Sequence, residues 1–352
     1  MEIMMKMKTL LICLFVLPIL ALAQPAGFDF EYVGPAVQTE GMHVWGSSPV
    51  IGPDGKVHVY VARWPFDSQP NFNGWYKDCG IAHYVGDKPE GPFEFVRVAV
   101  ADQDGTFNAP HNPTIQHMDG KYVLCFIVNE NDKLKTQRII MLVADDLNDT
   151  WQPAAGAEED GTILRKSADS NDWNHTAKLG VSNPSLIKFN GKYMLYIKSV
   201  IPKGGYTYGV AVSSKLEGPY KNHPKKVTDG GIEDAYAFTM DDTVYLLSRN
   251  FGHIKGGSHG GGLLWRSEDG FWFPKGDVEL SFKPLSHYVG TAALKNGTKY
   301  RPPAKVKDYS GRLERPQILM IDGEPAYVYM ATGISTRDGY GSCSHVFRMK
   351  KR

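Results

Sequence analysis

The feature that most constrains the fold of this chain is a motif that occurs five times. Each copy has a polar pair, usually a proline, an apolar stretch, a tight turn and an alternating, aromatic-rich strand. The copies span Ser47–Val61, His111–Phe126, Ser182–Tyr196, Glu233–Leu247 and Glu314–Tyr329. The turn is Asp-Gly or Asn-Gly, except for Asp241-Asp242. Because these residues tolerate the positive φ of a type I′ turn, each copy is predicted to be a β-hairpin.

A further strand follows each hairpin, so each unit holds three or more antiparallel strands, the content of a propeller blade. We therefore predict an all-β, five-bladed β-propeller as a single domain over residues 24–352, with blades starting near residues 45, 110, 181, 232 and 313. The last unit ends with the chain, so Phe28–Val33 is predicted to supply its outer strand and to close the ring. An open β-sandwich explains short strands but not a motif repeated five times.

The first residues predict export. Lys6 and Lys8 precede an apolar run that ends in Ala21-Leu22-Ala23, the small-x-small pattern of a signal peptidase site. Residues 1–23 are therefore interpreted as a signal peptide, with an uncleaved N-terminal anchor as the alternative. The mature protein is expected in the periplasm or the extracellular medium, without contact to a membrane after cleavage.

The composition of the mature chain excludes some partners. The full chain carries a net charge of only +1, which argues against the basic surface that nucleic acid requires. Cys79, Cys125 and Cys343 follow the leader, too few for a disulfide framework, although one bridge stays open. Stability must then come from burial, and we expect a monomer or a small oligomer.

The polar pair at the start of each hairpin predicts a pocket. In a propeller the first strand of each blade lies nearest the axis, so corresponding positions converge around one funnel. Aligned on the proline column, the pairs read Ser47-Ser48, His111-Asn112, Ser182-Asn183, Glu233-Asp234 and Glu314-Arg315. Ten polar side chains facing one pore are typical of a pocket for a hydroxyl-rich ligand.

Two stretches carry a resemblance to a known group of enzymes. Asn183–Tyr196, followed by Val210–Tyr220, resembles the repeat of the five-bladed glycoside hydrolases of family 43 and the related anhydro-galactosidases of family 117. The resemblance covers almost the whole mature chain at the level of the repeat. It implies a glycosidase acting on short chains or chain ends, with carboxylates at the starts of the inner strands.

Glycoside hydrolysis needs one protonated and one ionised carboxyl group. The resemblance favours Glu233 as the general acid, with its neighbour Asp234 raising its pKa by like-charge repulsion. Neighbours on a regular strand point to opposite faces, so only one of the two needs to line the pore. Family 43 carries aspartates where this chain has Ser47-Ser48 and His111-Asn112, so its usual base is missing. Glu314 and His111 are the substitute candidates.

Sugar recognition requires aromatic faces for C–H groups, and amides or guanidinium groups for hydroxyls or a carboxylate. Aromatic candidates within a few residues of the inner-strand starts are Trp45, Trp173 and Tyr236. Asn112 and Asn183 suit hydroxyl groups, and Arg249 and Arg315 suit an acidic group. Ser47 and His175 are further polar candidates for the pocket.

The leading hypothesis is a secreted glycoside hydrolase that cleaves a plant or algal oligosaccharide, most simply from a chain end. A polysaccharide lyase on the same scaffold is the alternative, because the usual base is missing while His, Tyr and Arg are plentiful. A non-catalytic glycan-binding propeller is the third hypothesis. None of these three functions requires a cofactor. A metal ion on the propeller axis, held by His111, is compatible with the sequence, but no metal-binding motif indicates it.

Overall fold

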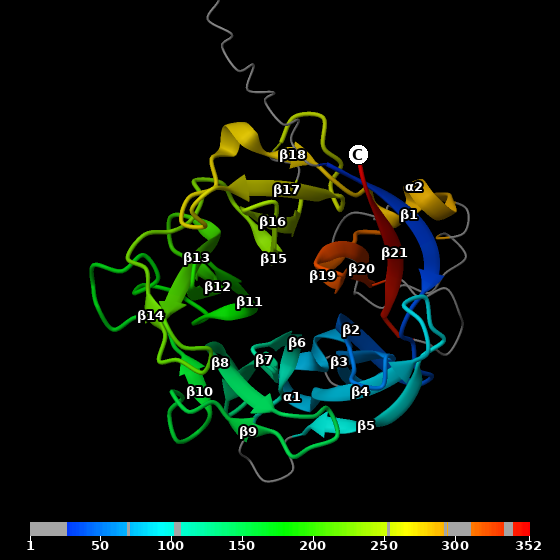
Figure 1. The fold of residues 1–352 in the computed structure, drawn as a ribbon, viewed down its shortest axis with the longest axis horizontal. Coiled ribbons are helices and arrows are strands. Elements are labelled where there is room, and N and C mark those ends of the chain that lie inside the picture. The colour runs from blue at the N-terminus through cyan, green and yellow to red at the C-terminus, as the bar shows by residue number, and fades with distance from the viewer. Residues whose placement is uncertain are drawn as a thin grey trace, which may run out of the picture.

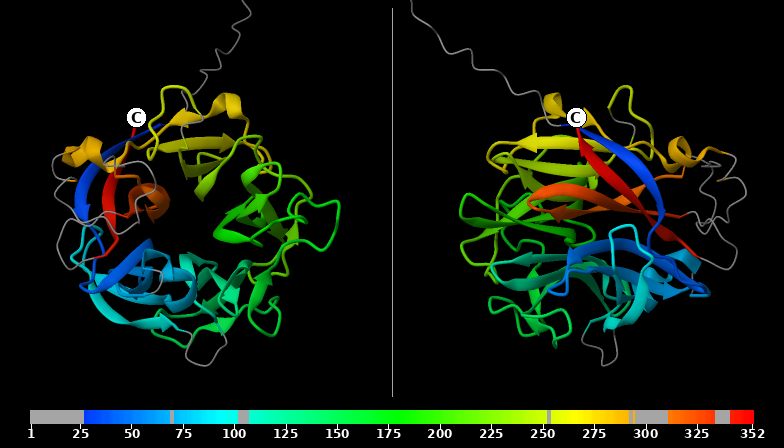
Figure 2. Two further views of the ribbon diagram at one scale, coloured as in Figure 1. Left: turned by 180° about the vertical axis from the view of Figure 1, so that it is seen from behind. Right: turned by 45° about the vertical axis from the view of Figure 1, so that its right-hand side comes forward.

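The computed structural model describes residues 27–68, 71–101, 107–251, 254–291, 294, 311–333 and 341–352, so the predicted signal peptide lies outside the described residues. Five antiparallel sheets stand in a ring around a central axis (Figure 1). The views from behind and from the side show the same ring (Figure 2). The prediction of a single, five-bladed β-propeller is confirmed.

Each blade is numbered here in chain order, and its strands run from the axis outward. Blade 1 holds β2 (Met42–Ile51), β3 (Val57–Pro65), β4 (Gly80–Gly86) and β5 (Glu94–Val100). Blade 2 holds β6 (His111–Met118), β7 (Lys121–Glu130), β8 (Lys133–Ala144) and β10 (Thr162–Leu164), with β9 (Gln152–Pro153) also paired to β8. Blade 3 holds β11 (Ser182–Phe189), β12 (Lys192–Ile201), β13 (Gly205–Ser213) and β14 (Lys221–Asn222). Blade 4 holds β15 (Glu233–Met240), β16 (Thr243–Arg249), β17 (Gly262–Ser267) and β18 (Glu279–Leu280).

Blade 5 joins the two ends of the described chain. Its inner strands are β19 (Glu314–Ile321), β20 (Glu324–Thr332) and β21 (Cys343–Lys351), and its outer strand is β1 (Phe28–Pro35), which pairs antiparallel with β21. The predicted closure of the ring is therefore confirmed. Short helices lie between strands: α1 (Trp75–Asp78), α2 (Leu285–Val289) and the 3₁₀ turns Asn71–Gly74 and Lys275–Asp277.

Four of the five hairpin turns have the predicted type I′ conformation. Both central residues have positive φ in Asp119-Gly120, Asn190-Gly191, Asp241-Asp242 and Asp322-Gly323, as a type I′ turn requires. Blade 1 differs, because only Gly55 of its Asp-Gly pair has positive φ and five residues separate β2 from β3. The prediction of a two-residue turn is wrong there.

The hydrophobic core lies between the blades. Each of five buried clusters contains side chains from two neighbouring blades, so every blade packs against both neighbours. Cys79, Cys125 and Cys343 are buried and no disulfide joins any two of them, which answers the open question of a bridge among them. Within the described residues, no helix is long and apolar enough to cross a membrane.

Ring closure generates the first prediction. Phe28 on β1 is buried between blades 4 and 5 and makes an edge contact with Phe238 at a ring-centroid distance of 6.1 Å. Phe28→Ala should lower the free energy of unfolding by about 3 kcal/mol, because it leaves a cavity where the ring closes. Urea unfolding measures this, and Phe95→Ala, at a side chain that is 48% exposed, should cost less than about 1 kcal/mol. Equal effects of the two changes would contradict the closing role of β1.

Buried histidines generate the second prediction. Burial lowers the pKa of His43, His83, His111 and His345 to about 4. The unfolded chain takes up protons near pH 6.5, while these side chains stay neutral in the folded state until about pH 4. Stability should therefore fall as the pH drops from about 6.5 towards 4. Melting temperatures between pH 7 and 5, where most carboxylates remain ionised, measure the loss. A flat profile would contradict the burial of neutral imidazoles.

Candidate active site

The five inner strands share an irregularity near their starts. In blades 2 to 5 the second residue of the polar pair has a positive φ: Asn112 (50°), Asn183 (52°), Asp234 (55°) and Arg315 (54°). In blade 1 the residue with positive φ is Gly46 (61°), which precedes Ser47-Ser48. At the same place the pairing register between the first and second strands of every blade shifts by one residue. Such a bulge re-aims side chains, so two successive residues turn towards the axis. Glu233 and Asp234 therefore both line the cavity, although a regular strand would present only one of them.

The register also corrects the alignment of blade 1. Trp45 pairs with Ala62 and precedes the shift, as His111, Ser182, Glu233 and Glu314 do in the other blades. The equivalent of the polar pair is thus Trp45-Gly46, not Ser47-Ser48, because the proline of blade 1 lies two positions later in the motif. Ser47 is buried and its Oγ donates to Ser344 Oγ at 2.6 Å. Ser47 does not line the cavity that the polar pairs predicted; it joins blades 1 and 5.

The left-handed residues form a hydrogen-bonded belt around the axis. Asn112 Nδ2 donates to Asn183 Oδ1 at 2.9 Å, and Asn183 Nδ2 donates to Asp234 Oδ1 at 2.7 Å. Arg315 is fully buried, and its Nη2 donates to the carbonyl of Asn112 at 3.1 Å. The belt thus links blades 2 to 5 and fixes the direction of the Asp234 carboxylate.

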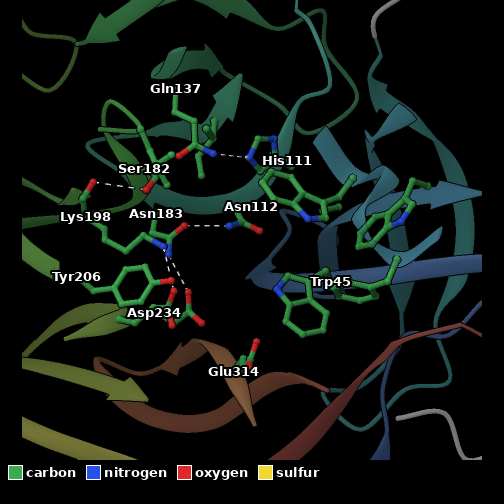
Figure 3. A pocket seen from close by; sticks show the side chains of 17 residues that line it. Trp45, His111, Asn112, Gln137, Ser182, Asn183, Lys198, Tyr206, Asp234 and Glu314 are labelled. Carbon is green, nitrogen blue, oxygen red and sulfur yellow. Dashed lines mark hydrogen bonds and ion pairs between the residues drawn. The ribbon is translucent and has the colours of Figure 1, made fainter. Parts of the chain in front are cut away.

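Above the belt lies a cavity of about 220 Å³. Figure 3 shows polar side chains of blades 2 to 5 on one side and the indole of Trp45 on the other. The lining residues are Trp45, Ala62, Trp64, Phe72, Trp75, His111, Asn112, Ile127, Gln137, Leu179, Ser182, Asn183, Lys198, Tyr206, Glu233, Asp234 and Glu314. One wall is therefore aromatic and the opposite wall carries acids, amides and a lysine, a division that suits a sugar ring.

One guanidinium joins two of the acids. Arg249 Nη1 lies 2.9 Å from Glu233 Oε2 and 3.0 Å from Glu314 Oε1. Lys198 Nζ lies 3.3 Å from the other oxygen of Glu233. Arg249 itself does not line the cavity, but it holds both carboxylates, and its guanidinium lies over the ring of Phe251 at 4.6 Å.

The environment of Glu233 raises its pKa. Burial is the largest cause, and the charges of Asp234 and Glu314 act in the same direction, against Lys198 and Arg249. The expected like-charge effect of Asp234 is thus present but secondary to desolvation. A carboxyl group whose pKa is raised is suited to give a proton near neutral pH.

His111 faces the cavity as a neutral imidazole. Its Nδ1 donates to the carbonyl of Ala109 at 2.7 Å, which leaves Nε2 as an acceptor, 3.5 Å from Gln137 Nε2. Burial lowers its pKa to about 4. His111 is therefore a weak base, better suited to accept a hydrogen bond than to take a proton from a substrate.

Four other predicted binding residues lie away from this cavity. Trp173 packs against the core between blades 2 and 3, and the Nδ1 atom of His175 lies 3.2 Å from the carbonyl of Ser167. Tyr236 lines a separate funnel formed by the far ends of the inner strands. Arg315 is the fully buried member of the belt and does not line the cavity.

Sequence reasoning missed Trp64, Trp75, Gln137, Lys198 and Tyr206. The register of the hairpin could have indicated that Lys198 lines the cavity, because Lys198 on β12 pairs with Ser182 on β11. The residues in the corresponding register of blades 1 and 2 are Ala62 and Ile127, which also line the cavity. Trp75 lies in α1, between two strands of blade 1 and outside the repeated motif, so the repeat could not indicate that it lines the cavity.

A metal centre finds no support among the side chains the structure describes. No group of three or more His, Cys, Asp or Glu residues in those segments is arranged to hold a metal ion. Glu233 and Glu314 are paired instead with Lys198 and Arg249, and Asp234 accepts a hydrogen bond from Asn183. An axial ion held by His111 therefore stays a prediction without a ligand set.

The belt generates the third prediction. Asn183→Ala removes two hydrogen bonds, one of them to a carboxylate, and leaves alanine with a positive φ, so it should cost about 2–4 kcal/mol of unfolding free energy. Asn183→Gly removes the same bonds but tolerates the backbone, so it should be the less destabilising by about 1 kcal/mol. Urea unfolding of the two variants tests this. If glycine costs as much as alanine or more, the left-handed bulge is not under strain.

The ring and its blades are similar to those of solved glycoside hydrolases. A family 117 glycoside hydrolase produced by the marine bacterium Zobellia galactanivorans superposes with a TM-score of 0.63 at 15% identity, over 92% of this chain and 90% of that chain. A family 43 β-xylosidase/α-arabinofuranosidase from a compost microbial metagenome gives 0.56 at 13% identity, over 92% and 94%. A family 62 α-L-arabinofuranosidase catalytic domain from Coprinopsis cinerea gives 0.57 at 10% identity, over 92% and 98%.

Similarity at this distance concerns the fold. No protein-family model and no curated protein matches the sequence. The expected resemblance to the five-bladed propellers of glycoside hydrolase families 43 and 117 is therefore confirmed in three dimensions, as a likeness of architecture.

Proposed function

We propose that this protein is a glycoside hydrolase with Glu233 as general acid and Glu314 as the ionised carboxylate. The observation that carries the proposal is their shared contact with Arg249. Glu233 Oε2 and Glu314 Oε1 lie 2.9 and 3.0 Å from the same nitrogen, so these oxygens are less than about 6 Å apart. Carboxyl groups about 5–5.5 Å apart are typical of retaining glycosidases, whereas inverting ones need about 6.5–9.5 Å.

The roles follow from the two environments. Burial favours the protonated form of Glu233, while Glu314 remains beside Arg249 and, at 4.0 Å, Arg312. In the first step Glu233 gives its proton to the leaving oxygen as the C–O bond breaks, and a Glu314 oxygen bonds to the anomeric carbon. In the second step Glu233 takes a proton from water, whose oxygen displaces Glu314. Asp234, held by Asn183, adds negative charge beside the developing cation.

The size of the cavity supports action at a chain end. Its volume of about 220 Å³ is below the roughly 300–1,000 Å³ of typical ligand pockets. A single sugar ring, stacked on the aromatic wall, fits such a space better than a polymer does. Export through the predicted signal peptide is part of this proposal, as is a plant or algal oligosaccharide as substrate.

A lyase is the less favoured candidate. It needs a base that takes the proton from C5 of a uronate, and His111, with its pKa lowered to about 4, is poorly suited to that task. The two reactions differ in their products, since a lyase forms an absorbing unsaturated sugar and a hydrolase releases only reducing ends.

A screen of plant and algal oligosaccharides, with products resolved by mass, tests the proposal. Glu233→Gln should lower kcat by about 10²–10⁴ for the cleaved glycan. Glu94→Gln, at an exposed acid on β5, is the matched control and should leave turnover unchanged. Proton NMR of the first product should show retention of anomeric configuration. Inversion would refute Glu314 as nucleophile, and full activity of Glu233→Gln, or binding of glycans without cleavage, would refute the hydrolase.

A further inference from the structure

Lys198 occupies a position that catalysis by Glu233 would disturb. Its side chain is only 12% exposed and its Nζ lies 3.3 Å from Glu233 Oε1. Within the described part of the chain, Glu233 is the one carboxylate that pairs with this ammonium group. A general acid must be protonated before it reacts, and a protonated Glu233 no longer neutralises Lys198.

The other cation at Glu233 does not face this difficulty. Arg249 keeps Glu314 at 3.0 Å when Glu233 becomes neutral. Among the described residues, Lys198 would keep only the ring of Tyr206 as a partner, whose centroid lies 5.2 Å from Nζ. A nearly buried ammonium group without an anion is strongly unfavourable. In the state in which the site would act, Lys198 is therefore left without a negatively charged partner among the described residues.

We propose that the substrate supplies this charge, as a carboxylate or a sulfate ester beside the cleaved bond, and that Lys198 binds it. Lys198 and Tyr206 line the same cavity next to each other (Figure 3), and Tyr206 is 40% exposed, so this part of the cavity lies close to the surface. The inference rests on the proposed function and narrows its substrate to anionic glycosides. Arg249 and Arg315 were predicted to bind an acidic group, but neither lines the cavity; the inference assigns this role to Lys198.

Substrate binding would then activate the acid. The groups that face Glu233 are Lys198 from β12, Asp234 from β15, Arg249 from β16 and Glu314 from β19. Lys198 is the foremost of those that lower the pKa of Glu233. When its ammonium group turns to an anion on the substrate, that opposition weakens and Glu233 holds its proton to a higher pH. A neutral analogue would bind without this effect.

Binding to Glu233→Gln tests the inference separately from turnover, because glutamine leaves Lys198 free for a ligand. Titration calorimetry would compare uronate-ended and sulfated oligosaccharides of plant and algal polysaccharides with their methyl-esterified or desulfated forms. We expect at least one charged glycan to bind tenfold or more tightly than its neutral form. If the difference in affinity appears between a uronate and its methyl ester, the recognised anion is a carboxylate. If it appears between a sulfated glycan and its desulfated form, the anion is a sulfate ester. Adding Lys198→Met should remove the preference, and adding Lys192→Met, at an exposed lysine on the same strand, should not.

The outcomes separate the two proposals. If no charged glycan is preferred, or if Lys198→Met keeps the preference, the inference is wrong while the hydrolase proposal stands on the Glu233 and product tests. If the charge preference depends on Lys198 but the unmodified protein cleaves nothing, the hydrolase proposal fails and the site is an anionic-glycan binding site. For the unmodified enzyme, the alkaline limb of kcat should lie at higher pH with the charged substrate than with its neutral form.

Discussion

The left-handed residue near the start of each inner strand is the constraint on which the site depends. A regular strand sends alternate side chains to opposite faces, so only one of two successive residues would point towards the axis. The bulge turns two successive residues inward, which brings Glu233 and Asp234 to one cavity and lets Asn112 and Asn183 join side by side. Asparagine and aspartate suit this backbone because their short polar side chains tolerate the left-handed region.

Charge balance is the second organising feature. Three carboxylates, Glu233, Asp234 and Glu314, share a small, largely buried space with Lys198 and Arg249. In the resting site each carboxylate has a cation or an amide donor as partner. Protonation of Glu233 removes the ion pair of Lys198 but leaves that of Arg249 with Glu314, because Arg249 contacts two acids. Specificity for a charged ligand and activation of the acid would then have one physical origin.

The sequence predicted the architecture well because its signals are local. Asp119-Gly120 and Asn190-Gly191 each form a turn within two residues. The fifth repeat lacks an outer strand of its own, and this gap predicted that β1 completes blade 5. The predictions failed where the repeat was read by residue type alone. The proline column placed Ser47 in the pocket, whereas pairing with the second strand places Trp45 there. Tyr236 follows an inner-strand start but faces the opposite funnel, because it lies beyond the bulge.

By itself, the sequence determined five hairpin-based blades, a ring closed by the N-terminal strand, and acids at the starts of two inner strands. These follow from turn chemistry and strand alternation, which act over a few residues. Only the tertiary structure decided that Arg249 joins Glu233 to Glu314, that Lys198 faces Glu233 from another blade, and that Arg315 is buried and does not line the cavity. Such contacts depend on distances between residues far apart in the chain, set by blade packing and by the register of each hairpin, and no local pattern encodes them.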